Sequence, residues 1–340
     1  MFERVFLQEG HLVRPFSHGH GVTCRGYSLP LQRRITDFGA DEPFGKVSGK
    51  LQEHYGITVP ASSARVITEH HAQGIHEHEQ EGLQHTIPEH AGSACIIAET
   101  EGTMIPILTP IDRETAAALP DKRKARKGGW KEARLTLTHA QGSVSPVFGG
   151  TIGRPDDVGD QLLSCALRSG MGQATYVHNV DDGAPWIAHQ VDRVFGAQGE
   201  FLVDFYHLCE YLSAASTACA PNEAARFFAL QKQQMKTNQT TTVLNALQPH
   251  IEPDAIPDER APVRCCSRYI TNREGQFNYQ GALDKDLPIG SGEIESAHRY
   301  LIQDRLKIAG AWWDEDNARN MISLRILRAN GDWEEYWKNN

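Results

Sequence analysis

Six carboxylates of the chain stand in three close pairs, each beside a segment that could form a strand or a helix. Divalent-metal catalysis of phosphodiester cleavage uses two or three carboxylates around ions roughly 3.5 to 4 Å apart, one ion activating the attacking oxygen and the other stabilising the leaving oxygen. The pairs are therefore candidate metal ligands if the fold brings them together. They are Glu99 with Glu101, Asp181 with Asp182, and Glu293 with Glu295.

The last pair opens an amphipathic segment, and helical geometry separates its two members. Glu293 lies about 200° around the helix from Glu295, which leads us to expect that Glu295 faces a sheet. The alternative is that both glutamates only favour the positive end of a helix capped by Ser291, an arrangement worth a few tenths to about 1 kcal/mol. The residues that share the face of Glu295, at offsets of 4, 7 and 11, are Arg299, Ile302 and Leu306.

The segment that holds the first two pairs predicts seven elements in the order β-β-β-α-β-α-β. Alternation at period two puts Glu99 and Glu101 on one face of the first strand, while Asp181 and Asp182 end the fourth strand. The expected elements cover, in order, residues 94–108, 131–140, 143–153, 158–167, 175–180, 184–196 and 200–207. This is the element order of the RNase H-like fold, in which strand ends and a later helix converge their carboxylates on one site.

We therefore expect an α/β protein: an RNase H-like core, with a mixed five-stranded sheet and flanking helices, an all-α insertion and a small N-terminal helical region. Residues 91–207 form the first part of the core, 208–286 the insertion, and 287–340 the last catalytic helix and a C-terminal helix. In residues 1–90, the pattern over 39–73 fits a helix-turn-helix, followed by a histidine-rich polar connector. A generic helical hairpin is the alternative, because the second helix carries a single basic residue.

The 340 residues carry a formal net charge of −9, 40% apolar residues and seven cysteines without a C-x-x-C pair. This charge argues against indiscriminate coating of nucleic acid, since phosphate contacts need local positive potential. No apolar run approaches about 18 residues, and no signal-peptide pattern opens the chain, so we expect a cytoplasmic protein without membrane spans. Two basic clusters are candidate DNA contacts, with solvated loops as the alternative: Lys122, Arg123, Lys124, Arg126 and Lys127, and Arg299, Arg305 and Lys307.

Long strings of the chain resemble insertion-sequence transposases of the Kra type. They are ETEGTMIPI, DGAPWI, DFYHLCEYL and LPIGSGEIESAHRYLIQDRLKIAGAWW. The resemblance runs from about Arg14 over nearly the whole chain. It implies a DDE-type metal site with two Mg²⁺ or Mn²⁺ ions, acting on double-stranded DNA at the element's terminal repeats and at the target. It also implies a homo-oligomer in the bacterial cytoplasm, associated with the nucleoid.

Carried over by motif, the resemblance places the first ligand on Glu101, the second on Asp182 and the third on Glu295. An Asp-x-x-His motif of related transposases falls on Asp204 and His207. His207 would support the site by a hydrogen bond to a strand-end carbonyl or carboxylate, with an ordinary core histidine as the alternative. Asp204 is the alternative second ligand, ranked below Asp182 because it ends the fifth strand rather than the fourth.

Glu101 departs from the family pattern, which has Asp before Gly-Thr-Met-Ile-Pro. The extra methylene would move the carboxylate by about 1 Å or more unless the rotamer compensates, and misplacement on that scale can lower a rate around 10²-fold. Glu99 is the candidate substitute. The expected function is metal-dependent phosphodiester hydrolysis at transposon ends and strand transfer to target DNA. The alternatives are a catalytically impaired, transposase-derived DNA-binding protein and a hydrolase of RNA or single strands.

Overall fold

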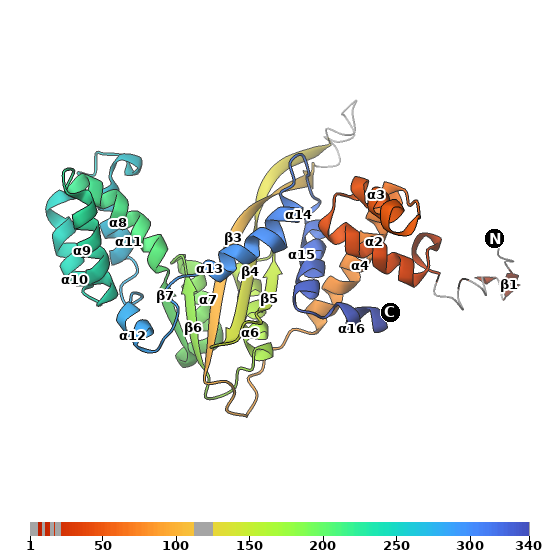
Figure 1. Ribbon diagram of the computed structural model, residues 1–340, viewed down its shortest axis with the longest axis horizontal. Helices are drawn as coiled ribbons and strands as arrows, with labels where there is room; N and C mark the ends of the chain where they lie inside the picture. Colours follow the sequence, from red (N-terminus) through yellow and green to blue (C-terminus); the bar gives the residue numbers. More distant parts are fainter. Residues whose placement is uncertain (1–5, 9–10, 14–16, 18–21, 112–124, 340) are drawn as a thin grey trace.

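The chain folds around a mixed five-stranded open sheet with flanking helices (Figure 1). The structure is a computed structural model that describes residues 6–8, 11–13, 17, 22–111 and 125–339. The strands of the sheet are β3 (Cys95–Pro110), β4 (Arg126–Ala140), β5 (Val147–Thr151), β6 (Tyr176–Asp181) and β7 (Gly199–Val203). Their order is β5-β4-β3-β6-β7, with β3, β4 and β5 antiparallel and β6 and β7 parallel to β3. The α/β class and the mixed sheet are as predicted.

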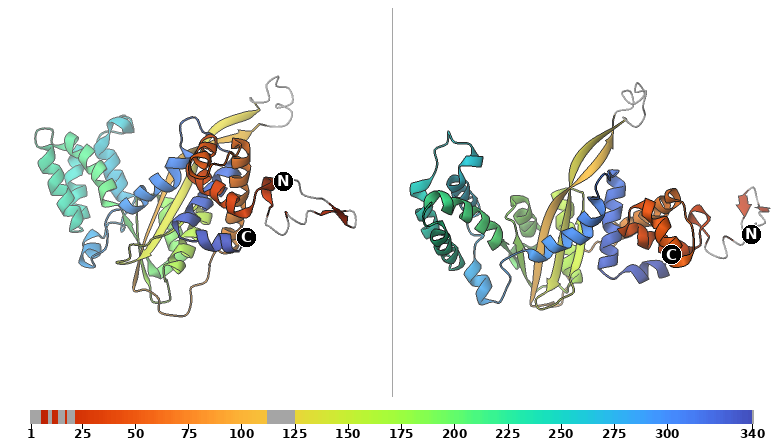
Figure 2. Two further views of the ribbon diagram at one scale, coloured as in Figure 1. Left: turned by 45° about the vertical axis from the view of Figure 1, so that its right-hand side comes forward. Right: turned by 45° about the horizontal axis from the view of Figure 1, so that its top comes forward.

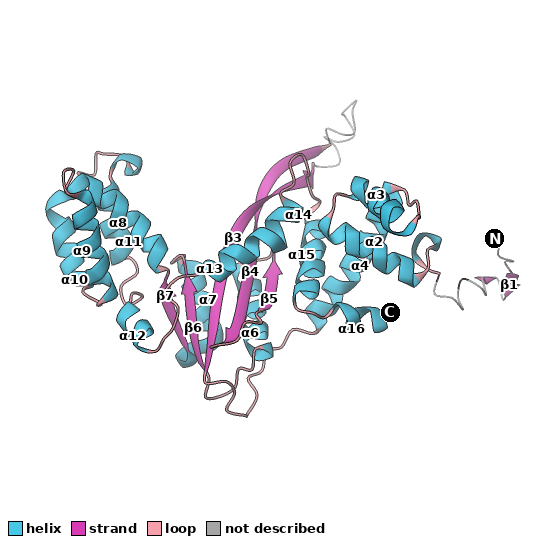
Figure 3. Cartoon of the chain, viewed as in Figure 1, coloured by secondary structure: helices cyan, strands magenta, loops and turns pink. Residues whose placement is uncertain are grey.

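Strands β3 and β4 are much longer than their neighbours and continue past the sheet as a two-stranded ribbon (Figure 3). They pair throughout residues 96–110 and 126–140, whereas β3 pairs with β6 only over 95–98 and β4 with β5 only over 134–138. The second strand therefore begins five residues before its predicted start at 131, because residues 126–130 pair with β3.

Alternating residues of β3 pack against different helices. Ile96 and Ala98 belong to the core cluster that contains helices α6 (Pro155–Arg168) and α7 (Pro185–Phe195). Ile105 and the other odd-numbered apolar residues of the ribbon pack against the C-terminal helices. Because side chains of a strand alternate between faces, α6 and α7 cover one face of the sheet and α13 crosses the other (Figure 1). The C-terminal elements are α13 (Gly292–His298), a π-helical turn (Arg299–Gln303), α14 (Asp304–Leu306), α15 (Glu315–Ala329) and α16 (Trp333–Lys338).

The predicted helical insertion lies beyond the β7 edge of the sheet (Figure 2). It begins with α8 directly after β7, three residues before the predicted boundary at 208, because Asp204 caps the first turn of that helix. Leu208 and Leu212 of α8 pack with Val263 and Ile270 of α11 in one buried cluster. The helices are α8 (Phe205–Cys219), α9 (Ala224–Lys236), α10 (Thr240–Leu247), α11 (Pro262–Thr271) and α12 (Tyr279–Asp284).

Three helices at the opposite end of the molecule pack around their own small core (Figure 2). Helices α3 and α4 coincide with the pair predicted as a possible helix-turn-helix, and α2 completes the bundle. The elements of this region are the short strands β1 (Phe6–Gln8) and β2 (His11–Val13) and the helices α2 (Leu29–Asp41), α3 (Phe44–Tyr55) and α4 (Ala61–Glu81).

The histidine-rich segment is a connector only in its second part, which corrects the prediction. Residues 70–81 of it form the second half of α4, whose Ala72 and Ile75 join the core of the sheet domain, and only residues 82–90 lie outside the helix. His71 is 4% exposed; its Nε2 lies 2.9 Å from Gln32 Oε1 and its Nδ1 3.0 Å from the Tyr336 hydroxyl. The polar composition concealed a helix because some histidines fill buried positions with satisfied hydrogen bonds. No helix in the described part of the chain could cross a membrane.

Candidate metal centre

Glu99 joins β3 to α13. Its side chain is 1% exposed, and Oε2 accepts a 2.8 Å hydrogen bond from the backbone N–H of Ile294 in the first turn of α13. Burial, together with nearby carboxylates such as that of Glu293, raises the pKa of Glu99 to about 8. Glu99 therefore acts as a cap of α13, and we do not retain it as a substitute for Glu101.

Glu101 stands two residues further along the same strand and is less well satisfied. Its Oε2 is buried and has no hydrogen-bond partner in the described structure. Burial, together with the charges of Glu295 and Asp182, raises the pKa of Glu101 to about 7. The two groups that repel Glu101 are therefore the other two predicted ligands, which come from α13 and from the end of β6.

The two aspartates that end β6 have different environments. Asp181 is fully buried, and its carboxylate accepts hydrogen bonds from the Thr100 backbone N–H, at 2.6 Å, and from the Asn179 amide. Burial raises the pKa of Asp181 well above its usual range. Asp182 is exposed, and its Oδ1 accepts a 2.8 Å hydrogen bond from the N–H of Ala184. Asp182 is thus the member of the pair that has an oxygen to offer to a ligand.

The helix that carries Glu295 does not bury the predicted face. Glu295 and Arg299 are exposed, whereas Ile302 and Leu306 are buried, so the expected stripe of these four residues is wrong. The cause is the π-helical turn Arg299–Gln303, because i→i+5 bonding changes the angle between residues before and after it. The residues that α13 buries against the sheet are Ile294, Ala297 and His298.

Glu293 and Glu295 have different neighbours, although it is Glu293, not Glu295, that contacts a strand of the sheet. Glu293 Oε2 lies 3.3 Å from His139 Nε2 of β4, whereas the charge of Glu295 acts on Glu101. In the part of the chain that the structure describes, no hydrogen bond engages the Glu295 carboxylate. The choice of Glu295 over Glu293 as a ligand therefore stays a prediction, and the helical face on which it was based is wrong.

Asp204 is occupied by four hydrogen bonds at the junction of β7, α8 and the turn before α13. Its Oδ1 accepts from the backbone N–H groups of Tyr206 and His207, at 2.6 and 2.9 Å. Its Oδ2 accepts from the N–H and the hydroxyl of Ser291, at 2.6 and 2.7 Å. A carboxylate has about four acceptor positions, so Asp204 supports the site and is a poor second ligand. Ser291 does not cap α13 with its side chain, contrary to the predicted alternative.

His207 does not make the predicted hydrogen bond to a strand-end carbonyl or carboxylate within the described residues. Its Nδ1 lies 3.8 Å from Glu210 Oε2 of the same helix, and its ring packs against Tyr211 and Tyr269. Its side chain is 37% exposed, so it is not an ordinary core histidine either. The supporting role of the motif therefore lies in Asp204.

His298 is a site residue that the sequence analysis missed. It is fully buried, and its Nε2 donates a 2.8 Å hydrogen bond to the backbone carbonyl of Glu101. Burial lowers the pKa of His298 to about 4, which keeps the imidazole neutral. It thereby fixes the helix of Glu295 to the strand of Glu101. Its position three residues after Glu295, on a neighbouring part of the helix, could have indicated this role. The sequence analysis placed Arg299 on the face of Glu295 and did not consider His298.

Some of the predicted DNA-contacting residues are exposed, and one is buried. Arg299, Lys307, Arg126 and Lys127 are exposed, the last two on the ribbon. Arg305 is 2% exposed and stacks between the rings of Phe44 and Trp313, at 4.8 and 4.7 Å, so its prediction as a DNA contact is wrong. A guanidinium is weakly hydrated, so the attraction to two aromatic rings exceeds the free energy that Arg305 loses by leaving water. Three further predicted contacts, Lys122, Arg123 and Lys124, lie outside the described residues.

The chemistry of the site fits a hard divalent cation. Its candidate donors are all carboxylate oxygens, and the buried Glu101 Oε2 lacks a partner that a cation would supply. Among the described residues, no three His, Cys, Asp or Glu side chains already stand close enough to share an ion. An ion held there would therefore require rotamer changes of the exposed Asp182 and Glu295 side chains.

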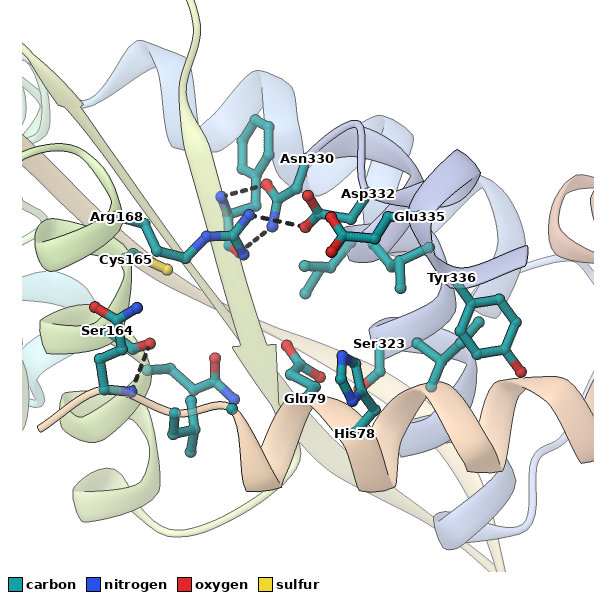
Figure 4. A pocket seen from close by; sticks show the side chains of 18 of the residues that line it. His78, Glu79, Ser164, Cys165, Arg168, Ser323, Asn330, Asp332, Glu335 and Tyr336 are labelled. Carbon is teal, nitrogen blue, oxygen red and sulfur yellow. Dashed lines mark hydrogen bonds and ion pairs between the residues drawn. The ribbon is translucent and has the colours of Figure 1, made fainter. Parts of the chain in front are cut away.

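A cavity of about 630 Å³ lies elsewhere, between α4, α6, α15 and α16 (Figure 4). Glu79 and Arg168 line it, and Arg168 Nη2 donates a 2.8 Å hydrogen bond to Asp332. Burial raises the pKa of Glu79 to about 7. None of the predicted site residues that the structure describes lines this cavity, so it is separate from the carboxylate cluster.

No protein-family model matches the chain, and a search of curated proteins gives no match.

Proposed function

We propose that the protein is a DNA transposase of the RNase H-like type, which cleaves a phosphodiester at the ends of its element and joins the freed 3′ hydroxyl to target DNA. The observation that carries the proposal is the environment of Glu101. The charged groups that raise the pKa of Glu101 are Glu295 and Asp182. The sequence motifs select the same two residues as metal ligands. The strand order and the parallel placement of β6 and β7 beside β3 are compatible with the proposed fold.

Glu101, Asp182 and Glu295 would hold one or two Mg²⁺ or Mn²⁺ ions. Bound there, the ions would activate the attacking oxygen and stabilise the leaving oxygen. The chain's own contribution is positioning. Asp204 fixes the turn before α13 and His298 ties α13 to β3, so both steps of the reaction would use carboxylates on elements that are held in place, after their side chains turn toward the ion.

Exposed cations near the carboxylates suit the DNA backbone. Lys307 Nζ lies 3.4 Å from Thr103 Oγ1 of β3, and Arg299 follows Glu295 by one helical turn. Arg126 and Lys127 extend the positive surface along the ribbon. Such contacts position a duplex without reading its sequence.

The experiment is Mg²⁺-dependent cleavage of duplex DNA that carries the element's terminal repeats. Asp182→Asn and Glu295→Gln are expected to abolish cleavage while the proteins stay folded, because each removes one ligand charge. Glu293→Gln is the matched control, since this neighbouring exposed glutamate faces His139 and should be dispensable. Full activity of Asp182→Asn or Glu295→Gln contradicts the proposal.

A second candidate function rests on Glu101 itself. Its extra methylene relative to Asp could leave a protein that binds transposon ends without cutting them. Glu101→Asp separates the two functions. If the variant gains no cleavage, and the wild type binds the ends but leaves them intact, the chain is a DNA-binding descendant of a transposase. Cleavage by either protein favours the enzyme.

A further inference from the structure

The turn that carries Asp182 is held by the helical insertion. The hydroxyl of Tyr269, on α11, donates a 2.7 Å hydrogen bond to the backbone carbonyl of Asp182. Nε of Arg273, two residues after α11, donates a 2.7 Å hydrogen bond to the carbonyl of Gly183. Two consecutive carbonyls after β6 are thus bound by residues 87 and 90 positions further along the chain.

The two residues that hold the turn are themselves fixed. The Arg273 guanidinium lies 3.8 Å from the centre of the Tyr269 ring, and its Nη1 donates a 3.2 Å hydrogen bond to the Tyr269 carbonyl. On α8, Tyr211 stacks against Tyr269 with ring centres 4.1 Å apart. Tyr269 is 5% exposed. The ring therefore has little freedom to withdraw its hydroxyl from the turn.

The turn and its two holders fit closely. Gly183 has φ +83°, a conformation that L side chains rarely adopt. A Cβ added there would lie 2.5 Å from Arg273 Nε and 3.0 Å from the Tyr269 hydroxyl. Glycine at this position thus serves both the backbone conformation and the approach of the insertion.

We propose that Tyr269 and Arg273 are positioning residues for the second carboxylate, so that the helical insertion is part of the metal centre. The proposal rests on the proposed function. Asp182 is exposed and its side chain accepts a hydrogen bond from Ala184, within the same turn. The direction of its carboxylate therefore depends on the backbone that Tyr269 and Arg273 hold. Residues that orient a metal ligand typically change metal affinity or activity 10- to 100-fold when removed.

The first measurement is hydrogen exchange of the metal-free full chain. In Tyr269→Phe, which deletes the hydroxyl and keeps the ring, and in Arg273→Met, amides of residues 182–184 should exchange faster than in the wild type. Tyr211→Phe is the matched control: its ring stacks on Tyr269, but within the described residues its hydroxyl does not bond to the turn. Unchanged exchange in both test variants overturns the proposal.

The second measurement is the affinity of the same proteins for Mn²⁺, with thermal unfolding as a check on folding. We expect a loss of affinity on the order of 10-fold or more in Tyr269→Phe and Arg273→Met and none in Tyr211→Phe. Wild-type affinity in both test variants overturns the positioning role. Failure of the proposed function has a different signature: the wild type would bind no Mn²⁺, although exchange at residues 182–184 still rises in the variants.

Discussion

The acidic residues around β3 divide according to what already binds their oxygens. Glu99, Asp181 and Asp204 accept hydrogen bonds from the protein in buried positions, and each connects two elements. Asp182 and Glu295 are exposed. With Glu101, whose Oε2 has no partner among the described residues, they form the set that we propose to hold a cation. In this proposal the buried carboxylates hold the elements around the site in place, and the other three would bind the ion.

Single-residue assignments could be predicted where a motif or strand alternation selected them. Glu101 in β3 and Asp182 directly after β6 lie where they were predicted, whereas their roles as ligands stay predictions. The role of Asp204 became clear only from its four hydrogen bonds, since its oxygens contact residues as distant as Ser291. Arg305 was wrongly predicted because a sequence does not show that two aromatic rings will enclose a cation.

Gly183 provides a test at the residue scale. A positive φ alone costs an L residue roughly 1–2 kcal/mol. Gly183→Ala should lower the free energy of unfolding by more than this, because the new Cβ would also displace Arg273. Gly142→Ala is the matched control, since Gly142 has φ +81° and open space around its Cβ position. Urea unfolding gives both free energies. Equal losses of stability would show that Arg273 does not press on the turn.

At the scale of elements, alternation and helical periodicity located the strands and most helices. The errors have local causes. A π-helical turn altered the face of α13, and the ribbon lengthened β4 through pairing that the basic sequence of residues 126–130 did not indicate. The positions of the helices relative to the carboxylates required contacts between distant segments, such as that of His298 with Glu101.

Two basic side chains of the C-terminal region are expected to have different roles: Arg305 stabilises the fold, and Lys307 binds DNA. Arg305→Met should lower the free energy of unfolding by about 2 kcal/mol or more, because it removes the hydrogen bond from Nε to the Gly39 carbonyl and two ring contacts. Lys307→Ala should leave stability unchanged and weaken binding to duplex DNA, reducing the salt dependence by about one phosphate contact. Chemical unfolding and DNA titrations at several salt concentrations distinguish them. Unchanged stability of Arg305→Met would contradict its structural role.

At the scale of the whole molecule, α4 connects the N-terminal helices to the sheet domain, and α11 connects the insertion to the end of β6. His71 lies at the first of these junctions. It bonds to Gln32 of α2 and to Tyr336 of α16. The division into an N-terminal unit, a core and an insertion was predictable from periodicity. The buried polar links between these parts were not, because they join residues far apart in sequence.

His71 predicts a pH dependence of stability. Burial lowers the pKa of His71 to about 4, so the folded protein keeps this ring neutral while the unfolded chain takes up a proton below about pH 6.5. The contribution of His71 to the free energy of unfolding is therefore fully present above pH 6.5 and is lost as the pH falls towards 4. The loss is roughly 3 kcal/mol at most. His71→Gln should flatten this part of the profile. The same substitution at the exposed His70 should not, and equal profiles of wild type and His71→Gln would refute the assignment.

The most direct test of the metal centre is a Mn²⁺ titration, followed by calorimetry, of the wild-type chain, Glu295→Gln and Glu293→Gln. The two variants lose one charge each from neighbouring exposed positions of α13. A centre built from Glu101, Asp182 and Glu295 predicts that the wild type and Glu293→Gln bind Mn²⁺ alike and that Glu295→Gln loses most of its affinity. Equal binding by Glu295→Gln and Glu293→Gln would contradict it.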